Sequence, residues 1–277
     1  DPGVSGFSAD WLALREPVDA AARNPELTAR LRDWRRGRGP LTVLDLASGT
    51  GANLRFLAPL LGGGQHWRLV DHDPALLARG EEQCVAWAAE QKMNLALDWQ
   101  RVDLVDDWER LDFRGARLVT ASALLDLVSV EWLERLAQRC RDARAAVFVV
   151  LSYDGSIVWE PALAGDERVR KQVNRHQRTD KGFGPALGPD AASTLAVRLR
   201  NLGYEVMLRP SPWRLEPQQR AMQTALLEGW VGAARAIAPE AEDDWADWLT
   251  QRRRWIERGT SRLRVGHGDL FAWGDAF

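Results

Sequence analysis

The feature that most constrains the fold is a glycine-rich turn between an apolar run and a helix-forming segment. Residues 41–46 are mostly apolar and include the acidic Asp45, and Gly49 and Gly51 follow within five residues. Residues 52–61 then have the apolar spacing of a helix. Glycine lets a backbone approach a ligand closely, and a helix N-terminus presents unpaired N–H groups. The segment therefore predicts a strand, a tight turn and a helix that hold a nucleotide.

Strand-like and helix-like segments alternate from residue 41 onward, which is typical of a mostly parallel sheet with helices on both faces. The start of the helix at residue 74 is well marked, because Asp73 suits the N-cap and Pro74 the first helical position. We predict strands at 41–46, 66–71, 94–102, 117–121, 145–152, 204–208 and 262–273. We predict helices at 8–22, 24–36, 52–61, 74–90, 130–142, 191–202, 216–238 and 242–258.

The length of 277 residues, of which 45% are hydrophobic, suits a single α/β domain, residues 1–277, with additions. Residues 154–189 are polar and interrupted by Gly and Pro, and we expect a long loop there, which in a compact domain is usually functional or mobile. We divide the domain into an N-terminal helical cap at 8–38, a cofactor-binding core at 41–152, a substrate loop at 153–190 and a helical insertion at 216–258.

Charge and cysteine content narrow the class of protein. The formal net charge is −2, so the chain has no overall basic field for nucleic acid. Cys84 and Cys140 lie in helix-like segments, which favours a reducing compartment without disulfides. We find no apolar run that approaches a membrane span and no signal-peptide pattern, so a cytoplasmic protein is expected. No histidine or cysteine pair has metal-ligand spacing, and we expect no metal.

Fourteen tryptophans are an unusual number for this length, and most of them should be core residues. One stripe in the predicted helix 242–258 recurs at helical spacing. The stripe packs against the body of the domain, or else it forms a lid or a homodimer face. Its members are Trp245, Trp248, Leu249, Arg252 and Trp255.

Polar residues stand at the ends of the first four predicted strands: Asp45, Asp71, Asp103 and Ser122. In an open α/β sheet, ligands bind outside the carboxyl ends of the strands. A carboxylate after the second strand can accept both hydroxyls of a ribose, and one after the third can accept an exocyclic amine. The four positions together predict a nucleoside site.

These residues resemble class I S-adenosylmethionine-dependent methyltransferases. The turn is similar to the family motif E/D-x-G-x-G-T-G, matched at Asp45, Ala47, Gly49, Thr50 and Gly51. The resemblance implies a doubly wound, seven-stranded, mostly parallel sheet whose last strand is antiparallel. It also implies S-adenosyl-L-methionine as the methyl donor and S-adenosyl-L-homocysteine as the product.

The resemblance carries roles to individual residues. Asp71 would bind the ribose, and His72 beside it would contact the cofactor or shape the turn. Asp103 would hold the adenine amino group, with Leu104 beside the ring. The remaining cofactor-binding positions are the turn residues Asp45, Ala47, Gly49, Gly51 and Asn53, and Ala121 and Ser122 near the methionine part. The family has glycine where this chain has Ala47, and we expect alanine to be tolerated there with a negative φ.

Two other functions stay open. An NAD-dependent oxidoreductase would need a third glycine after Gly49 and Gly51, where this chain has Leu54. Asp45 would also repel a diphosphate. A non-catalytic nucleotide-binding or scaffolding protein on the same fold is the second alternative, because the chain shows no clear acceptor-site motif.

The acceptor is expected to be a small polar metabolite that is methylated at O, N or C. Residues 121–125 lack the Asp/Asn-Pro-Pro-Tyr motif of amino-group DNA methyltransferases, and neither cysteine follows a proline. His176 is the best candidate for a general base, because histidine titrates near neutral pH. Tyr153 is a second candidate catalytic residue. Arg15 and Glu16 in the first helix are expected to close over the cofactor.

Overall fold

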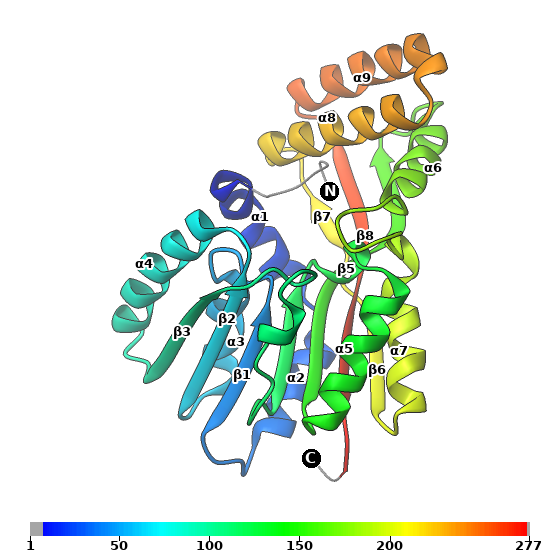
Figure 1. Ribbon diagram of the computed structural model, residues 1–277. Coiled ribbons are helices and arrows are strands. Elements are labelled where there is room, and N and C mark those ends of the chain that lie inside the picture. The colour runs from blue at the N-terminus through cyan, green and yellow to red at the C-terminus, as the bar shows by residue number, and fades with distance from the viewer. Residues whose placement is uncertain (1–7, 276–277) are drawn as a thin grey trace.

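A twisted open sheet forms the centre of the molecule in the computed structural model, which describes residues 8–275 (Figure 1). The strand order is β3-β2-β1-β4-β5-β8-β6, and the short β7 pairs with β8 beyond β6. The strands are β1 (Leu41–Leu46), β2 (Gln65–Asp71), β3 (Leu95–Arg101), β4 (Leu118–Ser122), β5 (Ala146–Glu160), β6 (Glu205–Pro210), β7 (Trp213–Leu215) and β8 (Arg262–Trp273).

The topology confirms the predicted fold class. Strands β1 to β5 are parallel, and β8 inserts antiparallel between β5 and β6. The chain moves outward from β1 to β3 and then returns to place β4 on the other side of β1. This reversal creates the crevice where such sheets bind ligands. Strand β7 is an addition that the sequence did not predict, and β5 continues eight residues past its predicted end at 152.

The helices begin where the sequence provides caps. Ser8, Asn24, Asp73 and Ser129 each accept a backbone N–H of the first helical turn. The helices are α1 (Ala9–Ala22), α2 (Pro25–Arg35), α3 (Ala52–Leu61), α4 (Pro74–Glu90), α5 (Val130–Asp142), α6 (Asp166–Gln177), α7 (Ala191–Asn201), α8 (Arg220–Ile237) and α9 (Glu242–Glu257). Short 3-10 turns lie at Trp108–Arg110, Leu125–Leu127, Gly188–Asp190 and Pro239–Ala241.

The predicted long loop at 154–189 is wrong for much of its length. It contains the end of β5 and the whole of α6. Helix α6 is strongly polar, and only Val169, Val173 and Gln177, one helical turn apart, are buried. This single apolar row is too narrow to stand out in a polar sequence, so composition alone favoured a loop.

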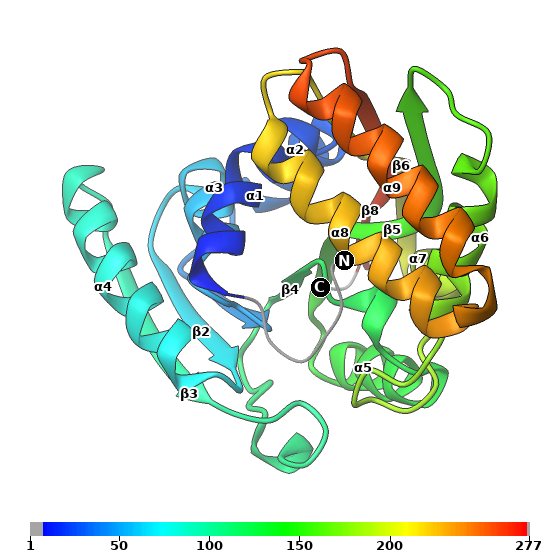
Figure 2. The same cartoon turned by 90° about the horizontal axis from the view of Figure 1, so that it is seen from above.

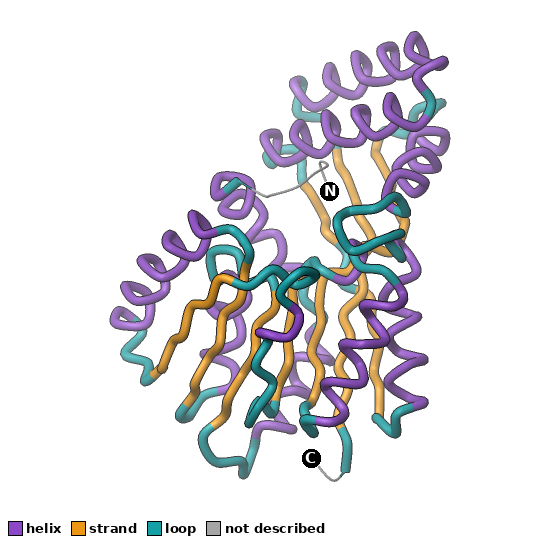
Figure 3. The backbone as a smooth tube through the Cα atoms, viewed as in Figure 1, coloured by secondary structure: helices purple, strands orange, loops and turns teal. Residues whose placement is uncertain are grey.

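Two apolar layers cover the two faces of the sheet. Alternate residues of a strand point to opposite faces, so Leu44 and Leu46 pack with α5 and α7, while Val43 packs with α2 and α3. Figure 3 shows the helices on both sides of the strands. The sheet is therefore buried on both faces, which explains why its central strands are almost continuously apolar.

A third apolar cluster lies beyond the carboxyl edge of the sheet. There the outer parts of β5 and β8 meet β7 and helices α1, α6, α8 and α9. Seen from above, α8 and α9 run side by side over this region (Figure 2). In the Trp stripe of α9, Trp245, Trp248 and Arg252 are buried, and the Arg252 guanidinium lies 5.1 Å from the centroid of Trp159. The stripe thus packs within its own chain, and we infer no dimer from it.

A bulge in β5 turns the strand toward this third cluster. The pairing register shifts between Val149 and Ser152, and Leu151 has φ 57°. The buried Asp269 of β8 stabilises the bulge, because its Oδ1 accepts the Leu151 N–H at 2.9 Å and the Ser211 hydroxyl at 2.5 Å. The bulge lets β5 and β8 extend past the sheet and form one wall of the site described below. No helix among residues 8–275 is long and apolar enough to cross a membrane.

Candidate functional site

A cavity of about 380 Å³ lies at the carboxyl ends of β1, β2 and β4, against α1. It collects most of the residues that the sequence predicted for a cofactor. The predicted residues in its lining are Asp45, Ala47, Gly49, Asn53, Asp71, His72, Asp103, Leu104 and Ser122. The strand ends thus converge as the predicted topology requires.

Two predicted residues, Gly51 and Ala121, lie outside the cavity lining. Gly51 is the N-cap of α3 with φ 89°, and a Cβ there would lie 2.5 Å from the Cys84 sulfur. Ala121 packs in the apolar layer that α5 and α7 cover. Gly51 thus serves the turn by permitting its backbone shape and its close packing on α4, and Ala121 serves the core.

Asp71 joins the ends of the first two strands. Its Oδ2 accepts the Gly49 N–H at 2.9 Å, and its Oδ1 accepts the Asp73 N–H at 2.9 Å. The residue is only 6% exposed, and the largely exposed His72 places its Nδ1 3.6 Å from Asp71 Oδ1. The glycine turn is therefore held in place by the carboxylate that the resemblance assigns to the ribose.

Ala47 departs from the expected backbone. We predicted a negative φ, whereas Ala47 has φ 54° in the left-handed region. A non-glycine residue there costs about 1–2 kcal/mol, because its Cβ crowds the following carbonyl oxygen. The glycine that the family motif has at this position would carry no such strain.

Asp45 is a buried carboxylate, and one of its oxygens accepts no hydrogen bond from the described residues. Its Oδ1 accepts the Asn53 amide at 3.1 Å, while Oδ2 has no hydrogen-bond partner among the described residues. Burial raises the pKa of Asp45 to about 7. The Ser48 hydroxyl and the Asn53 carbonyl oxygen also lack partners in the described chain. Because all three residues line the cavity, this end of it suits a ligand that brings a cation and hydrogen-bond donors.

Asp103 sits at a turn on the far side of the cavity. Its Oδ1 accepts the N–H groups of Val105 and Asp106, each at 2.8 Å, and these bonds lower the pKa of the carboxyl. Leu104 next to it is buried, and its carbonyl accepts the Trp132 indole N–H at 2.8 Å. A fixed carboxylate beside an apolar side chain is suited to a flat base with an amino group.

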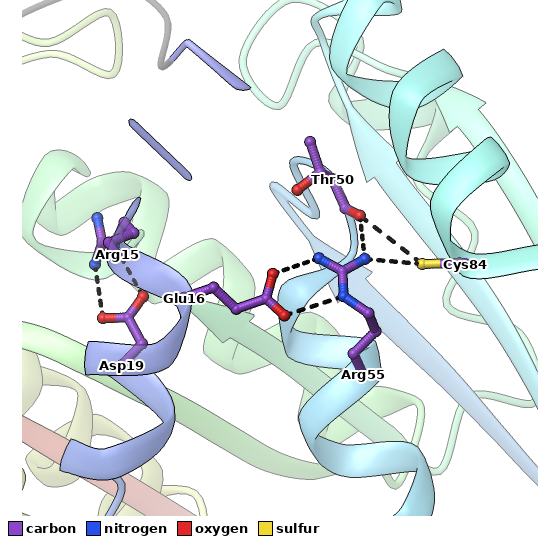
Figure 4. Close-up of polar contacts among 6 residues, drawn as sticks. All are labelled: Arg15, Glu16, Asp19, Thr50, Arg55 and Cys84. Carbon is purple, nitrogen blue, oxygen red and sulfur yellow. Dashed lines mark hydrogen bonds and ion pairs between the residues drawn. The ribbon is translucent and has the colours of Figure 1, made fainter. Parts of the chain in front are cut away.

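Helix α1 closes one side of the cavity through Leu12, Arg15 and Asp19. An ion pair fastens it to α3, because Glu16 Oε1 lies 2.6 Å from Arg55 Nη2 (Figure 4). The same guanidinium donates to the Thr50 carbonyl at 2.7 Å and to the Cys84 sulfur at 3.3 Å. The helix that covers the cavity is therefore tied directly to the glycine turn.

A second chamber of about 30 Å³ adjoins the cavity, and Arg15 and Ala123 line both. Tyr153 lines this chamber, but its hydroxyl donates to Asn174 Oδ1 at 2.6 Å and burial raises its pKa. Ala123 has φ 57°, and its N–H bonds the Val150 carbonyl at 3.0 Å. The end of β4 thus bends where the two spaces adjoin.

His176 lies in the last turn of α6, and neither cavity is lined by it. Burial lowers its pKa. The next residue, Gln177, does line the larger cavity, is 3% exposed, and has no hydrogen-bond partner for Oε1 among the described residues. Helical phase explains the difference, because Gln177 continues the buried row of Val169 and Val173.

Sequence reasoning missed several residues that line these spaces. Lys181 and Phe183 reach the larger cavity from the loop after α6, and Asp126 and His267 reach the chamber from after β4 and from β8. Among residues 8–275, no group of three or more His, Cys, Asp or Glu side chains could hold a metal ion.

Comparisons with known proteins give similarity only at the level of structure. No family model matches the chain, and no curated protein matches its sequence. A cyclopropane synthase from Mycobacterium tuberculosis is 13% identical, with 96% of this chain and 94% of that chain covered and a TM-score of 0.48. An S-adenosylmethionine-dependent methyltransferase from Geobacter sulfurreducens, solved with S-adenosyl-L-homocysteine, is 15% identical over 96% and 97%, with a TM-score of 0.45.

A third structure, described as a sarcosine dimethylglycine methyltransferase from Galdieria sulphuraria, is 15% identical. It covers 90% of this chain and 84% of that chain, with a TM-score of 0.46. Identities and TM-scores this low do not establish the function of this chain. The evidence for its function is therefore the site itself.

Proposed function

We propose that this chain is a class I S-adenosylmethionine-dependent methyltransferase that acts on a small polar molecule. The proposal depends on one observation: several buried polar atoms at the end of β1 have no hydrogen-bond partner in the described chain. Asp45 Oδ2, Ser48 Oγ and Asn53 Oδ1 all lack partners in the described chain and line one cavity with Asp71 and Asp103. Native proteins rarely leave buried polar atoms unpaired unless a ligand or water completes them.

The residues present fit this cofactor. The Asp45 carboxylate and its unpartnered neighbours would hold the ammonium group of the methionine part. Asp71 would accept the ribose hydroxyls, and Asp103 with Leu104 would hold the adenine. Each donor or acceptor on the protein thus has a counterpart of opposite character on the cofactor.

When bound, the cofactor supplies a methyl group on a positively charged sulfur, which is a strong electrophile. The protein's contribution to such a displacement is mainly to position the two reactants. Helix α1 would exclude water from above the cavity, because Leu12 and Arg15 line it and the Glu16–Arg55 pair holds the helix down. The bent backbone at Ala123 lines both this cavity and the smaller chamber.

A dinucleotide fits the same cavity less well. The third glycine of a dinucleotide motif is replaced by Leu54, which is fully buried under the sheet. A diphosphate at the turn would also face the Asp45 carboxylate without a cation from the ligand to offset it. The buried oxygens that lack a hydrogen-bond donor therefore favour a cationic ligand.

Isothermal titration calorimetry with S-adenosyl-L-homocysteine tests the proposal. We expect the wild-type chain to bind it, and Asp71→Ala to bind at least about tenfold more weakly, a loss of ~1.4 kcal/mol. Asp98→Ala is the matched control, because Asp98 is exposed on β3 outside the cavity and should leave the affinity unchanged.

No binding of either S-adenosylmethionine or its product by the wild-type chain would refute the proposal. Binding of NADH instead would favour the oxidoreductase alternative. Equal binding by Asp71→Ala would refute only the assignment of Asp71 to the ribose.

A further inference from the structure

His267 is a rigid part of the wall of the small chamber. It lies within β8, directly opposite Tyr153 of β5 in the pairing register. Its carbonyl accepts the Ser211 N–H at 2.8 Å, and the centroid of its ring lies 4.6 Å from that of Trp213. His267 is only 5% exposed. Backbone and ring are thus both fixed by neighbours.

One nitrogen of the His267 imidazole lacks a hydrogen-bond partner in the described chain. Its Nδ1 has no hydrogen-bond partner among residues 8–275. Burial lowers the pKa of the ring well below its usual 6.5, and the nearby Arg15 guanidinium lowers it further. Burial and Arg15 thus keep the ring neutral near pH 7, the form whose unprotonated nitrogen can accept a hydrogen bond. Leaving a buried polar atom unpaired is unfavourable, and a ligand that donates a hydrogen bond to Nδ1 would relieve this cost.

The charged groups that face the chamber come from α1 and from the turn after β4. Arg15 pairs with Asp19 at 2.8 Å and lies 5.0 Å from the centroid of Trp213. Asp126 is buried, and burial raises the pKa of its carboxyl. The walls from β7 and α8 contribute aromatic surface through Trp213 and Trp230. A nucleophile that enters loses its water shell and lies among aromatic rings and these groups.

We propose that this chamber receives the reacting end of the methyl acceptor, and that Nδ1 of His267 takes the proton from its O–H or N–H group. The inference rests on the proposed function, because the chamber adjoins the cavity assigned to the methyl donor. The lone pair of the acceptor oxygen or nitrogen forms a bond to the methyl carbon. The carbon–sulfur bond breaks with its electron pair going to sulfur, and the acceptor proton passes to Nδ1. Charge and electrons balance without an oxidant or reductant.

The chamber also restricts the class of acceptor. Its volume of about 30 Å³ holds about two water-sized groups. A narrow protic end, a hydroxyl or an amine, fits beside Trp213 and Trp230. The role proposed for Nδ1 requires a nucleophile that donates a hydrogen bond, which favours O or N over carbon as the methylated atom.

Methyl transfer to simple probes tests the inference. Propylamine, benzylamine and phenol are offered with radiolabelled S-adenosylmethionine, and the best probe is carried forward. His267→Asn should lower kcat about 10²–10⁴-fold, the usual contribution of a general base, while KM for the methyl donor stays unchanged. His66→Gln is the matched control, because His66 is a half-buried histidine of β2 outside both cavities and should keep the wild-type rate.

Two further measurements separate proton transfer from a structural role. In the wild type, kcat should fall only as pH drops below 6.5, because the neutral ring is required and its pKa is lowered. This acid limb should disappear in His267→Asn, and added imidazole should restore part of the rate of His267→Ala. Independently of turnover, ¹⁵N-histidine NMR of the complex with S-adenosyl-L-homocysteine should show the Nδ1 signal of His267 move when the probe is added.

Each outcome bears on the inference. If S-adenosyl-L-homocysteine binds but none of the three probes is methylated, the acceptor assignment is overturned while the proposed function stands. A wild-type rate and pH profile in His267→Asn would overturn the role of His267. If His267→Asn does not fold, as judged by circular dichroism, His267→Gln and the NMR signal of the wild type decide the question.

Discussion

The two cavities proposed as the cofactor side and the acceptor side of the site are built in opposite ways. The cofactor cavity takes its key polar groups from β1 to β3 and the turns that follow, between Asp45 and Asp103. The acceptor chamber assembles from segments spread over most of the chain, from Arg15 in α1 to His267 in β8. The first side depends on local turns at successive strand ends, and the second on long-range packing.

The two sides also differ in chemistry. The cofactor side holds polar atoms without partners, namely Asp45 Oδ2, Ser48 Oγ and Asn53 Oδ1. The acceptor side holds aromatic rings around the unpartnered Nδ1 of His267. Under the proposed function, a site with this division would bind a charged donor through hydrogen bonds and leave the acceptor in a desolvated space. The following predictions test that division, beginning with the largest expected effect.

The glycine turn should be the most sensitive part of the cofactor side. Gly51→Ala places a Cβ 2.5 Å from the Cys84 sulfur at φ 89°, so we expect a loss of about 3 kcal/mol in unfolding free energy from overpacking and backbone strain. Gly37→Ala is the control, because its φ is 75° with nothing within 4 Å, and it should lose only about 1–2 kcal/mol. Urea denaturation measures both, and equal losses would show that packing on Cys84 is unimportant.

The affinity of the cofactor side should depend on pH through Asp45. The pKa of Asp45 is raised to about 7, so the carboxylate that would hold the ammonium group is lost as pH falls below that value. We expect the Kd for S-adenosyl-L-homocysteine to rise up to about fivefold between pH 7 and pH 6, as the ionised fraction of Asp45 falls from about one half to about one tenth. In Asp45→Asn the affinity should be weaker and flat over the same range. A wild-type affinity that is constant from pH 8 to pH 6 would contradict the role of Asp45.

The raised pKa of Asp45 affects the stability of the ligand-free protein in the opposite direction. Affinity for the cofactor should rise with pH, whereas the contribution of Asp45 to stability should fall. The folded state holds a proton on Asp45 that the unfolded state releases above its ordinary pKa of 3.8. The contribution of Asp45 to stability is therefore complete below pH 3.8 and is lost as pH rises toward about 7. Asp45→Asn should remove this part of the pH dependence in urea denaturation, and an unchanged dependence would argue against a buried, raised carboxyl.

The link between α1 and α3 should govern how long the cofactor stays bound. Glu16→Gln removes the charge that pairs with Arg55, so the dissociation rate of S-adenosyl-L-homocysteine should rise about threefold to fivefold, an effect below ~1 kcal/mol for a partly exposed pair. Glu26→Gln, which breaks an exposed pair with Arg209 away from the cavity, is the control. Stopped-flow fluorescence measures both rates. Equal rates in the two variants would show that α1 does not act as a cover.

Ala47→Gly should have the smallest effect. Removing the Cβ relieves about 1–2 kcal/mol of left-handed strain, and the entropy of glycine offsets about 0.5–1 kcal/mol of it. We expect a net stabilisation of up to about 1 kcal/mol in urea denaturation, with cofactor affinity unchanged. A destabilised variant would show that the Ala47 methyl group contributes packing that outweighs the strain.

Most of the residues predicted for the cofactor line one cavity, because their signals in the sequence are local. Asp73 and Pro74 mark a helix start, and aspartates follow strands at spacings that βα units set. The two predicted residues outside the cavity lining, Gly51 and Ala121, instead pack on α4 and in the apolar layer under α5 and α7. The sign of φ at Ala47 likewise depends on the conformation of the whole turn in the folded chain, which the sequence motif does not specify.

The acceptor side could not be predicted in the same way. Its position depends on the bulge at Leu151, which Asp269 stabilises from 118 residues further along the chain. No local pattern announces such a contact, and the polar helix α6 has too narrow an apolar row to be recognised. His176 was therefore favoured over His267, although only His267 lines the chamber. Long-range strand pairing, rather than composition, decided which histidine reaches the site.

A crystal structure of the chain with S-adenosyl-L-homocysteine tests the central claim most directly. We predict the amino group at Asp45, the ribose at Asp71 and the adenine beside Asp103 and Leu104, with the sulfur facing Ala123 and the chamber of His267. A ligand bound outside this cavity, or a sulfur turned away from the chamber, would contradict the account.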